Sequence, residues 1–292
     1  MEAKNETKFN NIVLIPTDFS EVCDNAVNHG IELARSLKYK VAILHVINKE
    51  TKSKLRKEDL DISYIENKLA DYKKKYESGC GVEVETIHVE GSIFSAINEV
   101  AVNIKANLMV LGTHGKKGLQ HLFGSFALKV VLESPVPVIV VQKKSFGDGY
   151  KEIVFPVSND VEPRQKVQWA KLMAKLFNAK VNIFQSFEKE TEMNNRLDII
   201  TRQITDIFDE SDLEYSIKKA DKSTDFADQV LSYAVTNDAK MIMIMTRPNL
   251  DVPGFSLSGW DERLMFNDAQ IPVMCINPVE VGTYYWEWIG TF

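Results

Sequence analysis

Ile12-Val13-Leu14-Ile15-Pro16 returns 140 residues later as Glu152-Ile153-Val154-Phe155-Pro156, and this recurrence decides the fold. Two further pairs of segments match at nearly the same spacing: residues 106–111 with 239–244, and residues 135–140 with 270–275. Self-similarity on this scale indicates a duplicated structural unit. We therefore predict two copies of one domain.

The first copy alternates short apolar runs with segments whose apolar residues recur at helical spacing. The runs typical of buried strands are residues 12–15, 41–46, 82–89, 108–111 and 136–142. The helical segments are residues 20–37, 60–76, 92–104 and 123–132. This alternation favours a parallel sheet, because a helix makes each return crossing. The prediction is an α/β fold of two repeated doubly wound domains, each a mostly parallel five-stranded sheet of order 3-2-1-4-5 with helices on both faces.

We predict one domain over residues 1–147, a second over 148–280 and an aromatic-rich tail over 281–292. The last strands of the two copies, 136–142 and 271–277, would each expose an unpaired edge if they stood alone. We therefore expect them to pair across a pseudo-two-fold axis, so that the chain forms an intramolecular pseudo-dimer. A homodimer is the intermolecular counterpart.

The composition is that of a globular protein: 292 residues with 45% hydrophobic and 26% charged side chains. A net charge of -6 argues against a basic protein that coats nucleic acid, so we expect no nucleic-acid partner. The apolar runs fall short of the roughly 18 residues that a membrane-spanning helix needs, and residues 1–10 hold no signal core, which favours the cytoplasm. Three cysteines without a Cys-x-x-Cys pair, and five histidines without zinc-binding spacing, argue against a metal site built by the protein.

Ligands of doubly wound sheets bind beyond the carboxyl ends of the strands, where the strand order reverses. For the order 3-2-1-4-5 this point lies between the first and fourth strands, so the loops after Ile15 and Leu111 form the candidate site. In the first loop, Asp18 is placed either to accept hydrogen bonds from ribose hydroxyls or to cap the following helix.

The second loop, Gly112-Thr113-His114-Gly115-Lys116-Lys117-Gly118, is rich in glycine. Glycines let backbone amides approach a phosphate closely, and a helix N-terminus adds partial positive charge. The alternative to phosphate binding is that the loop forms ordinary turns and that its lysines are only solvated. Because both loops converge on one crevice, each strengthens the case for a ligand.

These residues resemble the universal stress protein family, here as a tandem pair, over about Asn11–Asn277. The resemblance rests on five motifs: Ile12–Ser20, Leu44-His45-Val46, Gly91-Ser92, Gly112-Thr113-His114-Gly115 through Gly124-Ser125, and Ser134–Val141. Nucleotide-binding members of that family carry Gly-x2-Gly-x9-Gly-Ser/Thr, whereas this chain has eight residues, 116–123, between the second and third glycines. The resemblance implies a cytoplasmic ATP-binding module of the stress response, with one competent site in the first domain.

Carried over by residue, the resemblance implies that Asp18 contacts the ribose, Val46 the adenine, and the glycine loop with Ser125 the phosphates. The ligand would be ATP or another adenine nucleotide, with Mg²⁺ carried in by the phosphates. The predicted nucleotide-binding residues are Pro16, Thr17, Asp18, Val46, Gly112, His114, Gly115, Lys116, Gly124, Ser125 and Phe126.

The second copy departs from this pattern at nearly every matching position. Its counterparts to Asp18, Val46, Gly112, Gly115 and Ser125 are Ser158, Ser186, Met245, Pro248 and Trp260. A methionine fills room that a phosphate would take, and a proline has no N–H to donate. We predict that the second copy does not bind ATP in this way. Residues 248–260 could fill its crevice or hold another ligand, and the simpler interpretation is structural decay after duplication.

Three functional classes remain: a nucleotide-binding module, a slow ATPase, and a structural or interaction member of the family without nucleotide. A slow ATPase would use His114 or Asp18 to polarise a water. The chain contains neither a Walker loop nor a Gly-x-Ser-x-Gly elbow, so we expect at most weak hydrolysis and assign no catalytic residue.

Overall fold

The computed structural model describes residues 10–79, 81–114, 122–159, 163–221, 225–246 and 260–278. Its first half contains β1 (Ile12–Pro16), α1 (Glu21–Leu37), β2 (Lys40–Ile47), α2 (Lys49–Lys57), α3 (Ile62–Glu77), β3 (Val84–Glu90), α4 (Ile93–Asn103), β4 (Leu108–Gly112), α5 (Leu122–Leu132) and β5 (Val138–Val141). Its second half contains β6 (Glu152–Val157), a 3-10 turn η1 (Pro163–Lys166), α6 (Val167–Phe177), β7 (Lys180–Gln185), α7 (Thr191–Glu210), β8 (Tyr215–Lys219), α8 (Phe226–Thr236), β9 (Met241–Met245), α9 (Trp260–Met265) and β10 (Val273–Ile276).

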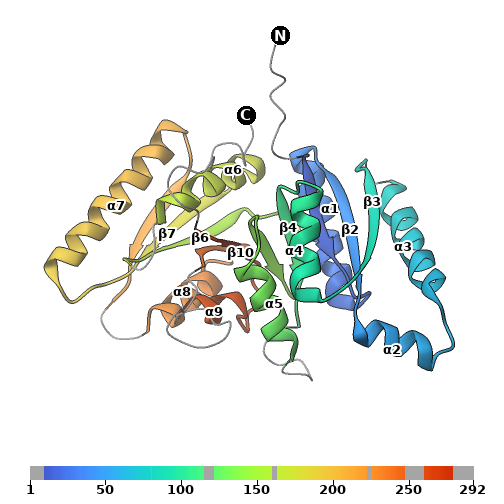
Figure 1. Cartoon of the computed structure of the whole chain (residues 1–292). Helices are drawn as coiled ribbons and strands as arrows, with labels where there is room; N and C mark the ends of the chain where they lie inside the picture. Colours follow the sequence, from blue (N-terminus) through green and yellow to red (C-terminus); the bar gives the residue numbers. More distant parts are fainter. Residues whose placement is uncertain are drawn as a thin grey trace, which may run out of the picture.

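All ten strands form one sheet in the order β3-β2-β1-β4-β5-β10-β9-β6-β7-β8. Each half therefore has the order 3-2-1-4-5, and the strand pairs within each half are parallel, as predicted. The halves meet where β10 pairs antiparallel with β5, through Val273 with Val140, Met274 with Ile139 and Cys275 with Val138. This is the expected pairing of the two last strands (Figure 1).

The helices cover both faces of the sheet, because successive residues of a buried strand point to opposite faces. In β1, Val13 and Ile15 belong to the core beneath α1, α3, α6 and α7. Ile12 and Leu14 belong to the core beneath α4, α5, α8 and α9. Strands that are buried on both faces consist of consecutive apolar residues. Short apolar runs therefore predicted most of the strands of the first half.

Two amide side chains at equivalent positions cross between the halves. Gln142, which follows β5, donates from Nε2 to the carbonyl oxygen of Asn267 at 2.9 Å. Asn277, which follows β10, donates from Nδ2 to the carbonyl oxygens of Val131 at 2.8 Å and Ser134 at 2.9 Å. We call this pairing of β5 with β10, together with Gln142 and Asn277, the seam.

The helix predicted over residues 60–76 is α3, but α2 before it was not predicted. None of the residues of α2 is buried, so no apolar periodicity marks it in the sequence. Its N-cap, Asn48, accepts a hydrogen bond from the backbone N–H of Thr51 at 2.8 Å and so fixes where the helix begins. Among the described residues, each helix is too short or too polar to span a membrane. The predicted tail, 281–292, lies outside the described residues.

Candidate functional site

The strands β1 and β4 separate toward their carboxyl ends. Their paired residues are Val13 with Leu108 and Leu14 with Met109, whereas β1 pairs with β2 along its whole length, Ile12–Pro16. The chain leaves β1 toward α1 and leaves β4 toward α5, on opposite faces of the sheet. The divergence therefore opens at the point where the strand order reverses, which is the position predicted for the site.

The loop after β1 is held rigidly. The backbone N–H of Thr17 donates to the carbonyl oxygen of Leu44 at 2.7 Å, and Thr17 Oγ1 accepts from the N–H of Phe19 at 3.0 Å. The carbonyl oxygen of Thr17 lies 2.8 Å from His45 Nδ1, so that nitrogen carries the proton and donates. Phe19 has a φ of 66°, which a non-glycine residue adopts only under such restraint.

Asp18 is exposed at the mouth of this loop, and its Oδ1 accepts a hydrogen bond from the N–H of Ser20 at 2.8 Å. Although Asp18 as a whole is exposed, the surrounding loop removes part of the water around its carboxylate and pushes its pKa upward. Hydrogen bonds from Ser20 and Cys23 and the nearby His114 outweigh this effect, so the pKa lies below its usual value. Asp18 is therefore a carboxylate at neutral pH. The structure shows its contact with the helix start and leaves ribose binding a prediction.

Behind this loop lies an aromatic cluster formed by Phe19, His45 and Tyr72. The ring of Phe19 stacks on that of His45 at 4.6 Å and meets Tyr72 edge-on at 5.4 Å. Burial lowers the pKa of His45, against the opposing effect of its bond to Thr17. Its Nε2 is buried without a hydrogen-bond partner among the described residues. The cluster supports the Asp18 loop from within and presents no charge to the crevice.

Gly112 ends β4 against the first turn of α1. A Cβ atom at Gly112 would lie 2.7 Å from the carbonyl oxygen of Val22 and 3.2 Å from Cα of Cys23. Both neighbours are backbone atoms, which cannot move aside without moving the helix. Close packing of the strand on the helix therefore requires this glycine, so its presence has a structural cause besides any contact with a phosphate.

The remaining predicted residues are described unevenly. Pro16 and Thr17 are buried at the end of β1, Val46 is buried in β2, and His114 is exposed after β4. Gly115 and Lys116 lie outside the described residues. For Gly124, Ser125 and Phe126 the structure describes only their place in α5. The structure thus brings together the β1 and β4 loops and leaves the phosphate end of the predicted site undescribed.

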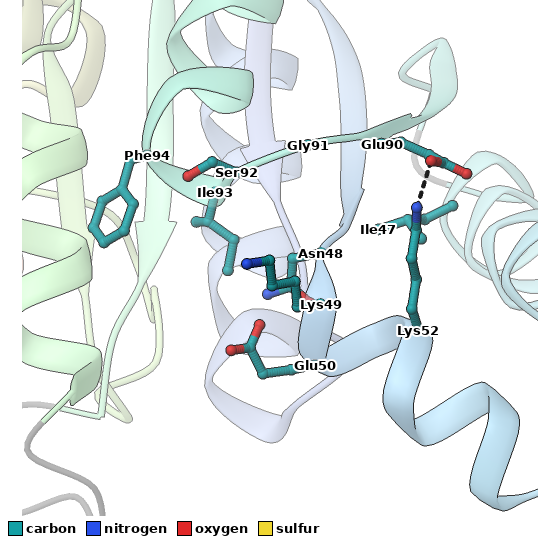
Figure 2. Close-up of a pocket in the computed structure, with 10 residues that line it drawn as sticks. All are labelled: Ile47, Asn48, Lys49, Glu50, Lys52, Glu90, Gly91, Ser92, Ile93 and Phe94. Atoms are coloured by element: carbon teal, nitrogen blue, oxygen red, sulfur yellow. Dashed lines mark hydrogen bonds and ion pairs between the residues drawn. The ribbon is translucent and has the colours of Figure 1, made fainter.

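A cleft of about 690 Å³ lies one strand further along, at the carboxyl ends of β2 and β3. Figure 2 shows Asn48 and Lys49 at the start of α2 on one wall, facing Ser92 and Ile93 at the start of α4. Its full lining is Ile47, Asn48, Lys49, Glu50, Lys52, Glu90, Gly91, Ser92, Ile93 and Phe94. Lys52 Nζ and Glu90 Oε2, 2.6 Å apart, form an ion pair at one side of it.

None of the predicted nucleotide-binding residues lines this cleft, although Val46 directly precedes Ile47. Most of the lining residues belong to the start of α2 or to the start of α4. In these two segments the only motif singled out in the sequence was Gly91-Ser92. The cleft combines apolar side chains, amide and hydroxyl groups, the ammonium groups of Lys49 and Lys52 and the carboxylates of Glu50 and Glu90. A site of this composition suits a polar small molecule with a flat apolar part.

The second half differs at the matching positions. Ser158 and Ser186 are buried, and Met245, the counterpart of Gly112, is 2% exposed. Pro248 and the loop predicted to fill the crevice lie outside the described residues, and the side chain of Trp260 is not described. Within the described part of the chain, no three His, Cys, Asp or Glu side chains gather as a metal site.

Comparison with known proteins finds similarity to one protein family. The profile of the Universal stress protein family matches residues 10–142. Two universal stress proteins of Methanocaldococcus jannaschii resemble the chain: MJ0531 is 34% identical over 144 residues, covering 45% of this chain and 81% of the relative. MJ0577 is 30% identical over 162 residues, covering 46% of this chain and 95% of the relative.

Across both halves, the chain resembles a solved universal stress protein from Archaeoglobus fulgidus, with a TM-score of 0.74 and 17% identity. This likeness covers 91% of this chain and 98% of the other. Because the identity is only 17%, this likeness shows the fold alone. It shows that the arrangement of two halves occurs in a known structure.

Proposed function

Because the chain belongs to the universal stress protein family, we propose that its first half binds an adenine nucleotide, ATP in the first instance, at the carboxyl ends of β1 and β4. The observation that carries this proposal is the divergence of the two strands, with the Asp18 carboxylate at its mouth and a cleft beside Val46. The chain would act as a nucleotide-responsive binding module of the stress response, and we expect it in the cytoplasm.

The described residues fit such a ligand in chemical terms. Asp18, ionised at neutral pH and exposed, has acceptor capacity for ribose hydroxyls beyond its bond to Ser20. The cleft next to Val46 has room for a flat base. The glycine loop and the start of α5 would hold the phosphates, and Mg²⁺ would bind chiefly through phosphate and water oxygens.

Calorimetric titration of nucleotide-stripped protein with Mg-ATP tests the proposal. We expect one site per chain, with Asp18→Ala weakening binding roughly tenfold, the size of one lost hydrogen bond. Gly115→Pro should abolish binding by removing a backbone N–H, and Ser92→Trp should weaken it by narrowing the cleft. Ser158→Ala, at the position matching Asp18 in the second half, is the control and should bind as the parent does. A chain that binds no Mg-ATP would instead be a structural or interaction member of the family.

Slow hydrolysis of the bound nucleotide is a second candidate, favoured by one observation. His114 lies near enough to Asp18 to help lower the pKa of that carboxylate, so the two groups flank the same crevice. Phosphate release measured over hours distinguishes a hydrolase from a binding module. His114→Ala should slow the release if the histidine orients water.

We also propose that residues 1–147 and 148–280 are the two domains of an intramolecular pseudo-dimer. The seam supports this division, since Gln142 and Asn277 make matching contacts in opposite directions. Light scattering on the intact chain tests whether two chains associate as well, and a doubled mass would establish the homodimer.

A further inference from the structure

Lys166 is a buried lysine at the end of the 3-10 turn that leads into α6. Only 1% of its surface is exposed. Its Nζ donates to the carbonyl oxygens of Pro156 and, at 3.1 Å, Met243, and lies 4.1 Å from the centroid of the Phe155 ring. Lysine side chains normally bring the ammonium group to water, so an ammonium buried in this way is held by its partners.

These partners lie at the second half's counterpart of the nucleotide crevice. Strands β6 and β9 pair at Ile153 with Met241 and at Val154 with Ile242, and they diverge beyond. Pro156 and Met243 are on the two diverging strands, so the ammonium of Lys166 bridges them. Two carbonyl oxygens and the face of an aromatic ring all present partial negative charge to it.

The start of the first helix differs between the two halves, and so does the residue at the end of the fourth strand. In the first half, Gly112 lets the first turn of α1 pack directly on the end of β4. At the same position of the second half Met245 is 2% exposed, and α6 begins at Val167, after the 3-10 turn η1; Val167 is the counterpart of Val27 in the second turn of α1. Lys166 takes the position of Ala26, and its long side chain reaches the gap between the strands.

We propose that Lys166 is a tethered ammonium ligand of the second half's crevice. Its ammonium group occupies a carbonyl-lined site between β6 and β9, and this occupation keeps the second half free of nucleotide. The exclusion of nucleotide from the second half rests on the proposed function, whereas the ammonium site rests on the contacts of Lys166 itself.

Lysine labelling of the native, full-length protein tests the site without any ligand. The chain is treated with an acetylating reagent, and modification is followed by peptide mass spectrometry. Lys166 should react roughly tenfold or more slowly than exposed Lys175 on α6, because it becomes accessible only when the crevice opens. Equal rates would overturn the proposal.

Substitution measures what the ammonium contributes. Lys166→Met keeps the apolar stem but leaves two buried carbonyl oxygens unpaired, and we expect the melting temperature to fall by roughly 5–10 °C. Lys175→Met is the matched control and should change it little. For Lys166→Ala, added n-butylammonium should raise the melting temperature and n-butanol should not. A Lys166→Met variant as stable as the parent would refute the site, and if Lys166→Ala does not fold, the labelling result decides.

Repeating the labelling with Mg-ATP separates this inference from the proposed function. We expect protection of Lys166 to be the same with and without the nucleotide. If Mg-ATP exposes Lys166, the nucleotide displaces the ammonium and the second half is itself a binding site, against the proposal. If the chain binds no Mg-ATP at all, the proposed function fails, and slow labelling of Lys166 still establishes the ammonium site.

Discussion

His29 on α1 is a buried histidine with both ring nitrogens hydrogen-bonded. Its Nε2 lies 3.0 Å from the carbonyl oxygen of Lys144, which accepts, so Nε2 carries the proton. Its Nδ1 then accepts from the hydroxyl of Tyr150 at 2.9 Å. Lys144 and Tyr150 belong to the segment that joins the two halves, so a neutral imidazole helps to anchor that segment.

Acidification should therefore destabilise the protein through His29. Burial lowers the pKa of His29 from 6.5 to about 4, against the opposing effect of the bond to Lys144. The unfolded chain thus takes up the proton first, and stability is lost as pH falls from about 7 toward 4. Between pH 7.5 and 5.5 we expect a loss of about 1 kcal/mol from this residue, measured by urea unfolding.

The matched variants identify the source of that pH dependence. His29→Gln should be less stable at pH 7.5 yet lose less stability on acidification. Asn98→Ala, which removes a buried amide that does not ionise, should lower stability and keep the parent's slope. If the free energy of unfolding of His29→Gln falls with pH as steeply as that of the parent, the buried imidazole is not the group that titrates.

At the scale of elements, the sequence predicted what is buried and missed what is not. Apolar runs marked β1 and its neighbours because both faces of the sheet are covered, and helical spacing marked α1 because one face packs on the core. No residue of helix α2 is fully buried, and Leu55 alone of its apolar side chains packs partly against the core, so the helix left no such pattern and the cleft that it borders was missed as well. Lys166 was missed for another reason: a lysine reads as solvent-exposed until its partners on distant strands are known.

Because α2 lacks buried residues, its N-cap should decide whether it persists. Asn48→Ala removes the side-chain acceptor for the N–H of Thr51, at an expected local cost of about 1 kcal/mol. Hydrogen exchange of residues 49–57 should then accelerate roughly fivefold, with little change in melting temperature.

Helix α3 supplies the control for that experiment. Its N-cap, Asp61, accepts from the N–H of Ser63 at 2.9 Å in the same way, but Ile65 and Leu69 anchor α3 in the core. Asp61→Ala should therefore leave most of the exchange in α3 unchanged. Equal acceleration in both helices would mean that packing does not distinguish them.

At the scale of the whole molecule, each face of the sheet has one hydrophobic core, and that core extends across the seam through both halves. Side chains from both halves contribute to each of these two cores, and the seam lies where the two halves meet. Unfolding either half would expose the edge of β5 or β10 and leave Gln142 or Asn277 without its partner. We therefore expect the intact chain to unfold in one calorimetric transition.

Weakening the seam should separate the two halves thermally. The double variant Gln142→Ala/Asn277→Ala removes hydrogen bonds worth about 1 kcal/mol each at the seam, while it leaves both cores intact. Calorimetry should then show two overlapping transitions, or a van't Hoff enthalpy well below the calorimetric one. Asn98→Ala, which breaks a bond to Val130 within the first half, is the control and should lower the transition without splitting it. A single sharp transition in the double variant would show that the β5–β10 backbone ladder and the shared cores couple the halves, because the amides would then add stability without carrying the cooperativity.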